Sequence, residues 1–218
     1  MKVKICGITN LQDAVDAVEA GADALLVVPP FYFKHVGLGG LLAYYEELLS
    51  ALPPESRIIL YNIPVTSGVE ISDELVDALL ARFAHMVAGV KDTSGQLERT
   101  QRYLARYPQL SIYIGSDGLA GAAVHMGARG AISGVANLFP EMVRAVIEAA
   151  PGSSEAAQAQ ERLNRVRELL HRYGSYAAVK QLLHSVAGLP LSHMRPPLED
   201  VAPELMETLR RELQAALA

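Results

Sequence analysis

The chain is poor in cysteine, in clustered positive charge and in long apolar runs. The single cysteine, Cys6, excludes a disulfide framework, a cysteine-rich zinc site and an iron–sulfur cluster, and it suits a reducing compartment. A net charge of −5 without a dense Lys/Arg run argues against binding to nucleic acid or to an anionic membrane surface. No apolar run approaches the about 20 residues of a membrane span, and the lysine-flanked start lacks the apolar region of a signal peptide. We therefore expect a cytoplasmic globular protein.

Motifs that would hold a metal ion or a phosphate group are also missing. The six histidines are scattered, and no pair has the spacing of HExxH or H-x3-H. The glycine-rich run at 37–40 lacks the lysine of a phosphate-binding loop and does not directly follow a predicted strand, so a flexible loop is expected there. We expect no metal site and no cofactor.

Apolar residues make up 50% of the 218 residues, enough for a sizeable core, and short β-branched runs alternate with amphipathic helical stretches. Strands followed by helices through short connections are typical of a parallel sheet with right-handed crossovers. The predicted strands are Val3–Ile8, Ala24–Val28, Arg57–Ile63, Met86–Val90, Leu110–Ile114 and Ala131–Val135.

The pattern changes after Pro151, where three consecutive helices are predicted at 153–170, 173–186 and 203–217. We therefore expect an α/β, TIM-barrel-like body over 1–150, with a helical C-terminal extension over 151–218 packed on the same domain. Because a closed (β/α)8 barrel needs eight strands, a sheet of about six is incomplete or rearranged.

Two residues at predicted strand ends are the strongest catalytic candidates. Lys91 ends the apolar strand in MVAGVKDTSG, where barrel active sites are built. Burial of its stem would lower the pKa of the amine and make it a nucleophile that forms a Schiff base, although a surface lysine that starts a loop fits as well. Tyr61 ends another strand and could transfer protons, or it could be a core tyrosine whose hydroxyl is hydrogen-bonded.

A third strand ends in Gly115-Ser116-Asp117, which offers backbone groups and a carboxylate to a polyhydroxylated ligand. Asp117 could equally cap the helix that follows, which is the commoner use of such a residue. The role of Asp92, beside Lys91, is ambiguous in the same way.

Together these segments resemble one enzyme family. YNIP (61–64), GVKDTSG (89–95), YIGSD (113–117) and GARGAISGVAN (127–137) are similar, in order and spacing, to the dihydrodipicolinate synthase/N-acetylneuraminate lyase family of Schiff-base aldolases. GADALLVVPPFYF (21–33) and MRPPL (194–198) extend the resemblance to the C-terminal part. It implies that Lys91 forms a Schiff base with pyruvate or another 2-keto acid and that Tyr61 transfers protons.

The resemblance also implies substrate-binding roles for Gly115, Asp117 and Ile132. Tyr32 matches the family's second, hydroxyl-relaying tyrosine, and otherwise it would line a pocket or pack in an interface. Since the relatives are commonly homotetramers, a homo-oligomer is expected.

Two departures from the family pattern bear on activity. The family's opening two βα units are not matched, including a GTTGE-like loop that binds the substrate carboxylate, so we expect weak or absent turnover unless another segment replaces it. Thr66 stands where dihydrodipicolinate synthases carry an arginine that binds the carboxylate of the aldehyde. This favours a sugar-acid aldolase-like relative over the lysine-pathway enzyme.

The first residues resemble a different enzyme. KVKICGITNLQDAVDAVEAGADAL (2–25) is similar to the opening of phosphoribosylanthranilate isomerase, which would make Cys6 a general base. We prefer a small buried residue on a strand, because the isomerase's general-acid aspartate and late phosphate-binding loops are not recognisable. The GADA segment, common to both families, suggests a chimera of an isomerase-like first βα unit and an aldolase-like body.

The expected function is a class I, metal-independent carbon–carbon or carbon–oxygen lyase whose substrate is a small 2-keto acid. The alternatives are a non-catalytic chimeric or truncated barrel scaffold and, third, a phosphoribosylanthranilate isomerase-like enzyme.

Overall fold

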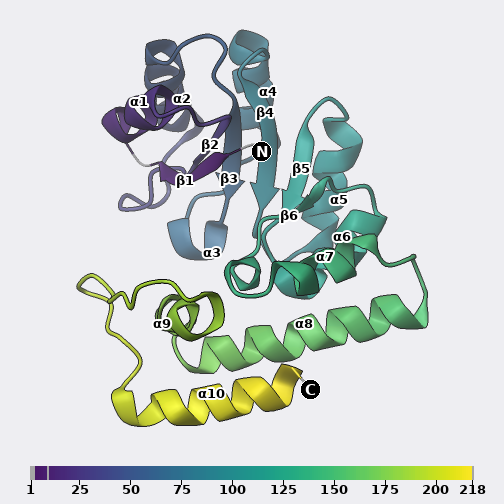
Figure 1. Ribbon diagram of the computed structural model, residues 1–218. Coiled ribbons are helices and arrows are strands. Elements are labelled where there is room, and N and C mark those ends of the chain that lie inside the picture. The colour runs from purple at the N-terminus through teal and green to yellow at the C-terminus, as the bar shows by residue number, and fades with distance from the viewer. Residues whose placement is uncertain (1–2, 9, 218) are drawn as a thin grey trace. The chain divides into compact units, whose positions relative to one another are not determined.

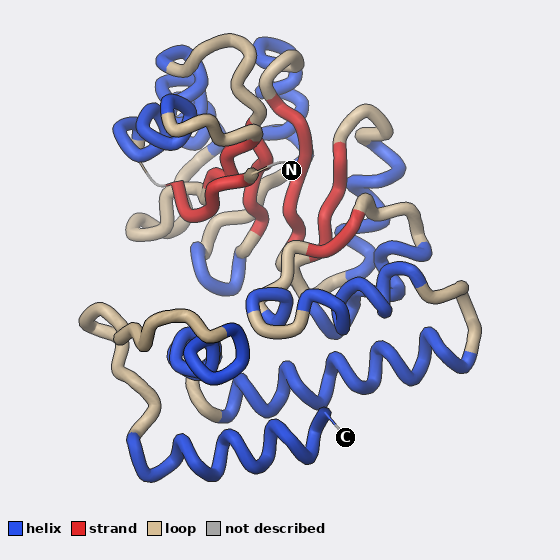
Figure 2. The backbone as a smooth tube through the Cα atoms, viewed as in Figure 1, coloured by secondary structure: helices blue, strands red, loops and turns tan. Residues whose placement is uncertain are grey.

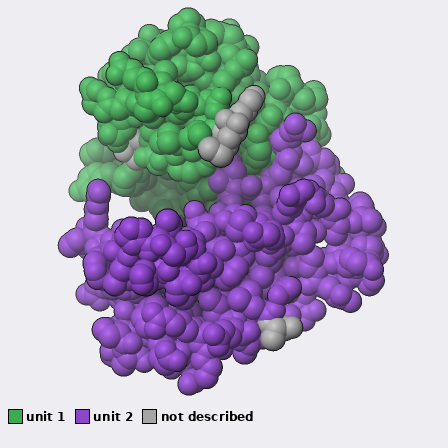
Figure 3. All heavy atoms as spheres, viewed as in Figure 1, with its two compact units in different colours: residues 1–114 green, residues 115–218 purple. Residues whose placement is uncertain are grey.

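The computed structural model describes residues 3–8 and 10–217, which form two compact units (Figure 3). Unit 1 covers 1–114 and unit 2 covers 115–218. Unit 2 thus begins before the change of pattern at residue 150, and it includes the three C-terminal helices.

Unit 1 is built from alternating strands and helices (Figure 1). In chain order they are β1 (Lys4–Ile8), α1 (Leu11–Glu19), β2 (Ala24–Val27), α2 (Leu38–Ala51), β3 (Ile58–Asn62), α3 (Pro64–Ser67), α4 (Asp73–Phe83), β4 (Val87–Asp92), α5 (Leu97–Arg106) and β5 (Ser111–Ile114). Each strand pairs in parallel with the next along the chain, so the carboxyl ends of the strands meet at one edge.

The hydrophobic core of unit 1 lies between one face of this sheet and its helices. Alternate residues of the strands point to that face, among them Val27, Leu60 and Val90, and they pack against buried side chains of α2, α4 and α5. The residues between them, such as Tyr61 and Lys91, therefore point to the opposite face. The strand pattern thus separates the core from the face that carries the candidate site.

Unit 2 is mainly helical (Figure 2). Its elements are the 3-10 helix η1 (Asp117–Leu119), α6 (Ala120–His125), β6 (Gly130–Ala131), the 3-10 helix η2 (Val135–Asn137), α7 (Pro140–Glu148), α8 (Ser154–Arg172), α9 (Ser175–Ala187) and α10 (Pro203–Leu217). Helix α10 returns alongside α8 (Figure 1). Arg172 of α8 pairs with Glu212 of α10 at 2.9 Å.

The six predicted strands are all present, and the prediction of an α/β, TIM-barrel-like fold is confirmed.

Local caps explain several helix starts. The side chains of Ser72 and Ser153 accept hydrogen bonds from backbone amides in the first turns of α4 and α8, at 3.3 and 3.0 Å.

Three local predictions were wrong. Helix α2 begins at Leu38, so the glycine-rich run at 37–40 is mostly helical, because burial of the apolar face of the helix outweighs the low helix propensity of Gly39 and Gly40. Strand β6 has only two residues, and a 3-10 turn replaces its predicted end. Strand β3 ends at Asn62, one residue before its predicted end at Ile63, and Pro64 then starts the one-turn helix α3, which Gly68 closes in the left-handed conformation.

Among the described residues, no helix is long and apolar enough to cross a membrane. A search of the same residues finds no group of three or more His, Cys, Asp or Glu side chains that could hold a metal ion.

Candidate functional site

Lys91 and Tyr61 lie side by side at the carboxyl edge of the sheet. They are register partners in the parallel pair β3–β4, so their side chains point to the same face. The Lys91 Nζ lies 3.9 Å from the centroid of the Tyr61 ring, and Lys91 is only 8% exposed. Lys91 is therefore not a surface lysine at the start of a loop.

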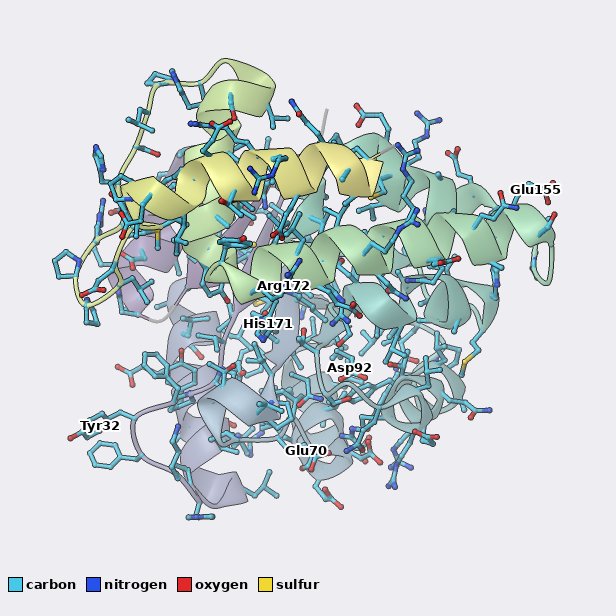
Figure 4. The ribbon with its side chains drawn as sticks, turned by 90° about the horizontal axis from the view of Figure 1, so that it is seen from below. Tyr32, Glu70, Asp92, Glu155, His171 and Arg172 are labelled. Carbon is cyan, nitrogen blue, oxygen red and sulfur yellow. The ribbon has the colours of Figure 1, made fainter. Side chains whose placement is uncertain are left out.

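The next register pair, Asn62 and Asp92, points to the opposite face and is fully buried. Asn62 donates to the Asp92 carboxylate at 2.9 Å, and the Thr100 hydroxyl donates to its other oxygen at 2.7 Å. The backbone amide of Ser94 adds a third hydrogen bond at 3.0 Å. Asp92, labelled in Figure 4, thus holds together the strand ends that present Tyr61 and Lys91.

The Tyr61 hydroxyl is kept in its protonated form. Burial raises the pKa of Tyr61 above its usual value, and the nearby side chain of Thr93 lowers this pKa in part. A protonated phenol at neutral pH can donate a proton to a developing oxyanion. Thr93, two residues after Lys91, is a residue that the sequence analysis did not single out, because an isolated threonine after a strand carries no motif of its own.

Cys6 and Lys4 also lie near Tyr61. Charge on Cys6 raises the pKa of Tyr61, and the charge of Lys4 lowers it. The expectation that Cys6 is buried was wrong: it is exposed, and the Lys4 ammonium donates to its Sγ. The strand pairing of β1 shifts register between Cys6 and Ile8, with Gly7 at φ +78°, and this local irregularity leaves the middle of the strand open to solvent.

Three further candidates, Gly115, Asp117 and Ile132, belong to unit 2. Gly115 and Ile132 are half-buried, and Asp117 is 9% exposed. Asp117 opens η1, whereas the residue before α6 is Leu119, which makes no side-chain capping bond, so Asp117 is not the cap of that helix. Its backbone is fixed by Gln160 of α8, which donates to the Asp117 carbonyl oxygen at 2.9 Å.

A mainly apolar pocket of about 320 Å³ opens beside Asp117 within unit 2. Asp117, Arg167 and Lys180 bring charge to a lining that otherwise consists largely of side chains such as Val135 and Leu183. The volume suits a small molecule.

Tyr32 lies apart from the Lys91–Tyr61 pair. It belongs to the segment between β2 and α2 and is 81% exposed. Its side chain points away from the rest of unit 1 (Figure 4). Its ring meets the ring of Phe33 edge to face, with the centroids 5.0 Å apart. Within the described residues the structure thus brings together Lys91, Tyr61 and Thr93, and it leaves Tyr32 at the periphery.

Comparison with known proteins gives a consistent result. The family model described as the dihydrodipicolinate synthetase family matches residues 4–216. An uncharacterized DapA-like lyase of Chloroflexus aurantiacus is 39% identical over 93% of the chain and 68% of its own length. A 4-hydroxy-tetrahydrodipicolinate synthase of Methanopyrus kandleri is 34% identical over 91% of the chain and 65% of its own length. The chain spans about two thirds of the length of these relatives.

Solved structures agree with the sequence matches. Dihydrodipicolinate synthase from Agrobacterium tumefaciens is 34% identical, with a TM-score of 0.83 over 99% of this chain and 75% of that one. The KD(P)G aldolase of T. tenax is 27% identical, with a TM-score of 0.86 over 99% of this chain and 76% of that one. The resemblance to the dihydrodipicolinate synthase/N-acetylneuraminate lyase family is therefore confirmed.

Proposed function

Because the chain belongs to the dihydrodipicolinate synthetase family, we propose that it is a class I lyase or aldolase that forms a Schiff base between Lys91 and pyruvate or another 2-keto acid. The observation that carries the proposal is the position of a buried lysine amine 3.9 Å from the ring of a tyrosine whose phenol stays protonated. Its relatives include an aldolase, a 4-hydroxy-tetrahydrodipicolinate synthase and an N-acetylneuraminate lyase, which supports the reaction class.

In the proposed reaction, the neutral Lys91 amine attacks the ketone carbon, and a protonated carbinolamine then loses water to give an iminium ion. Loss of a proton from the neighbouring carbon gives an enamine, whose electrons return to form a carbon–carbon bond with an aldehyde. Hydrolysis restores the amine and consumes the water released earlier. The contact between the Lys91 Nζ and the face of the Tyr61 ring, at 3.9 Å from the ring centroid, is given up as the new bond forms.

Tyr61 supplies and recovers protons in this scheme. Its phenol donates a proton to the oxygen of the attacked ketone, which leaves as water, and the phenolate takes a proton back from the hydroxyl group that water supplies when hydrolysis re-forms the carbonyl group.

For the second substrate we propose an uncharged hydroxyaldehyde. The support for this is Thr66, whose side chain offers no positive charge to a carboxylate on the aldehyde. A comparison of condensation rates of pyruvate with glyceraldehyde and with glyoxylate tests this step. Faster reaction with glyoxylate would contradict it.

The test of the imine and enamine steps needs no aldehyde. Incubation of pyruvate with the protein in D2O should replace the methyl protons by deuterium, because the enamine exchanges with solvent, and proton NMR follows the loss of the methyl signal. Lys91→Ala should abolish the exchange, and Tyr61→Phe should slow it by about 10²-fold or more.

Tyr113→Phe is the matched control, because Tyr113 is the register partner of Lys91 on the other side, in β5. Its exchange rate should stay close to that of the unmodified chain. Exchange that survives in Lys91→Ala, or is absent from the unmodified chain, would refute the proposed function and favour a non-catalytic scaffold.

A further inference from the structure

Lys34 connects two loops at the carboxyl edge of the unit 1 sheet. Its Nζ donates to the carbonyl oxygen of Phe31 at 2.6 Å, within its own segment, and to that of Ser67 at 2.8 Å, with Thr66 at 3.5 Å. Thr66 and Ser67 are the last two residues of the one-turn helix α3, and so short a helix offers their carbonyl oxygens no partner of its own. The ammonium group therefore closes α3 and holds the neighbouring segment against it.

Gly68 makes room for this contact. A Cβ atom at Gly68 would lie 2.5 Å from Lys34 Cδ, and the residue has φ +67°, so a side chain would be strained and would displace the lysine stem. The turn itself is firmly held, because the buried Ser67 hydroxyl lies within hydrogen-bond distance of the carbonyl oxygens of Ile63 and Val69, at 2.9 and 2.8 Å, and can donate to either.

The segment that Lys34 holds is residues 28–37, here called the aromatic segment. It has no helix or strand, and it exposes three consecutive aromatic side chains, Phe31, Tyr32 and Phe33, at 51%, 81% and 72%. Pro29 and Val36 anchor the two ends of the segment, but its three aromatic side chains are not fixed by burial, so a polar tether to a rigid neighbour affects the order of this part of the chain.

Lys91 and Tyr61 do not depend on this tether. They are positioned by strand pairing and by the buried Asn62–Asp92 pair. The aromatic segment and α3 instead follow the carboxyl ends of β2 and β3, where the loops of a barrel enzyme contact the larger parts of a substrate. The tether should thus affect the second substrate more than the chemistry on the 2-keto acid.

We propose that Lys34 is a positioning residue that fixes the aromatic segment to the last turn of α3 and thereby sets the binding of the aldehyde substrate. The catalytic part of this inference rests on the proposed function, whereas the tether itself does not.

Limited proteolysis with chymotrypsin tests the tether directly, because the protease cleaves after aromatic residues and needs a locally opened chain. Lys34→Met should accelerate cleavage after Phe31, Tyr32 and Phe33 by about three- to tenfold, as expected for loss of partly exposed charged hydrogen bonds. Lys34→Arg should largely restore protection, and Gly68→Ala should resemble Lys34→Met.

The control is Arg144→Met, which removes an exposed cation that pairs with Glu148 at 2.7 Å on α7. It should leave cleavage of the aromatic segment unchanged. Equal cleavage of Lys34→Met and the unmodified chain would overturn the proposed tether.

The kinetic test separates the two substrates. With Lys34→Met, deuterium exchange into pyruvate alone should stay within about twofold, while KM for glyceraldehyde rises by about threefold or more, with rescue by Lys34→Arg. An unchanged KM together with faster cleavage would refute the positioning role. Absence of exchange in the unmodified chain would refute the proposed function instead. The chymotrypsin cleavage of Lys34→Met would still show whether Lys34 holds the aromatic segment.

Discussion

Replacement of Asp92 by alanine should strongly destabilise unit 1. The carboxylate is fully buried and accepts hydrogen bonds from Asn62, Ser94 and Thr100 at 2.9, 3.0 and 2.7 Å. Without it, the buried amide of Asn62 and the buried hydroxyl of Thr100 lose an acceptor, at a cost of about 1–3 kcal/mol for each unsatisfied donor. We expect a loss of about 3–5 kcal/mol in the free energy of unfolding.

Asp92→Asn should cost less, about 1–2 kcal/mol, because its amide oxygen still accepts from Asn62 and Ser94, and its NH2 group can donate to the Thr100 hydroxyl. Thr100→Val and Asp92→Ala remove the same hydrogen bond. The stability loss of the double variant should therefore be smaller than the sum of the two single losses by about 1 kcal/mol or more. Asp16→Ala, on the exposed side of α1, is the control and should change stability by less than about 0.5 kcal/mol.

Urea denaturation followed by circular dichroism measures these differences, provided that the dependence of the unfolding free energy on urea concentration is unchanged. An Asp92→Ala variant within about 1 kcal/mol of the unmodified chain would refute the role given to this carboxylate.

Three further changes have clear expected results. Tyr45→Phe should stabilise the chain by about 1 kcal/mol in the same urea assay, because the buried Tyr45 hydroxyl finds no hydrogen-bond partner among the described residues, and a loss of stability would contradict this. Thr93→Val should move the alkaline limit of pyruvate proton exchange to higher pH, because it removes the polar group whose proximity lowers the pKa of Tyr61, and a shift to lower pH would contradict this role. Gly89→Ala should reduce both deuterium exchange and stability, because a Cβ atom would lie 2.2 Å from the Ser111 carbonyl oxygen in the pairing of β4 with β5. Circular dichroism and NMR measure the two effects, and a variant unchanged in both would contradict this prediction.

Much of the architecture follows from local patterns in the sequence. Continuous apolar runs ended by Pro64 or by a polar residue such as Lys91 mark buried parallel strands, and their order along the chain is their order in the unit 1 sheet. The positions of Lys91 and Tyr61 at strand ends were therefore predictable.

What puts Lys91 beside Tyr61 is the register of β3 against β4, and this depends on packing between distant segments. For the same reason the sequence left Asp92 ambiguous, although it lies next to Lys91, because the partners of its carboxylate come from β3 and α5. The exposure of Cys6 depends on the irregular pairing of β1, which no local pattern of the sequence indicates.

The most direct measurement of the central claim is reductive trapping of the imine. The chain is treated with borohydride in the presence of pyruvate, and intact mass followed by peptide mapping locates the adduct. We expect one reduced adduct per chain on Lys91, and none in Lys91→Ala. An adduct on a different lysine, or no adduct in the unmodified chain, would contradict the assignment of Lys91 as the Schiff-base residue.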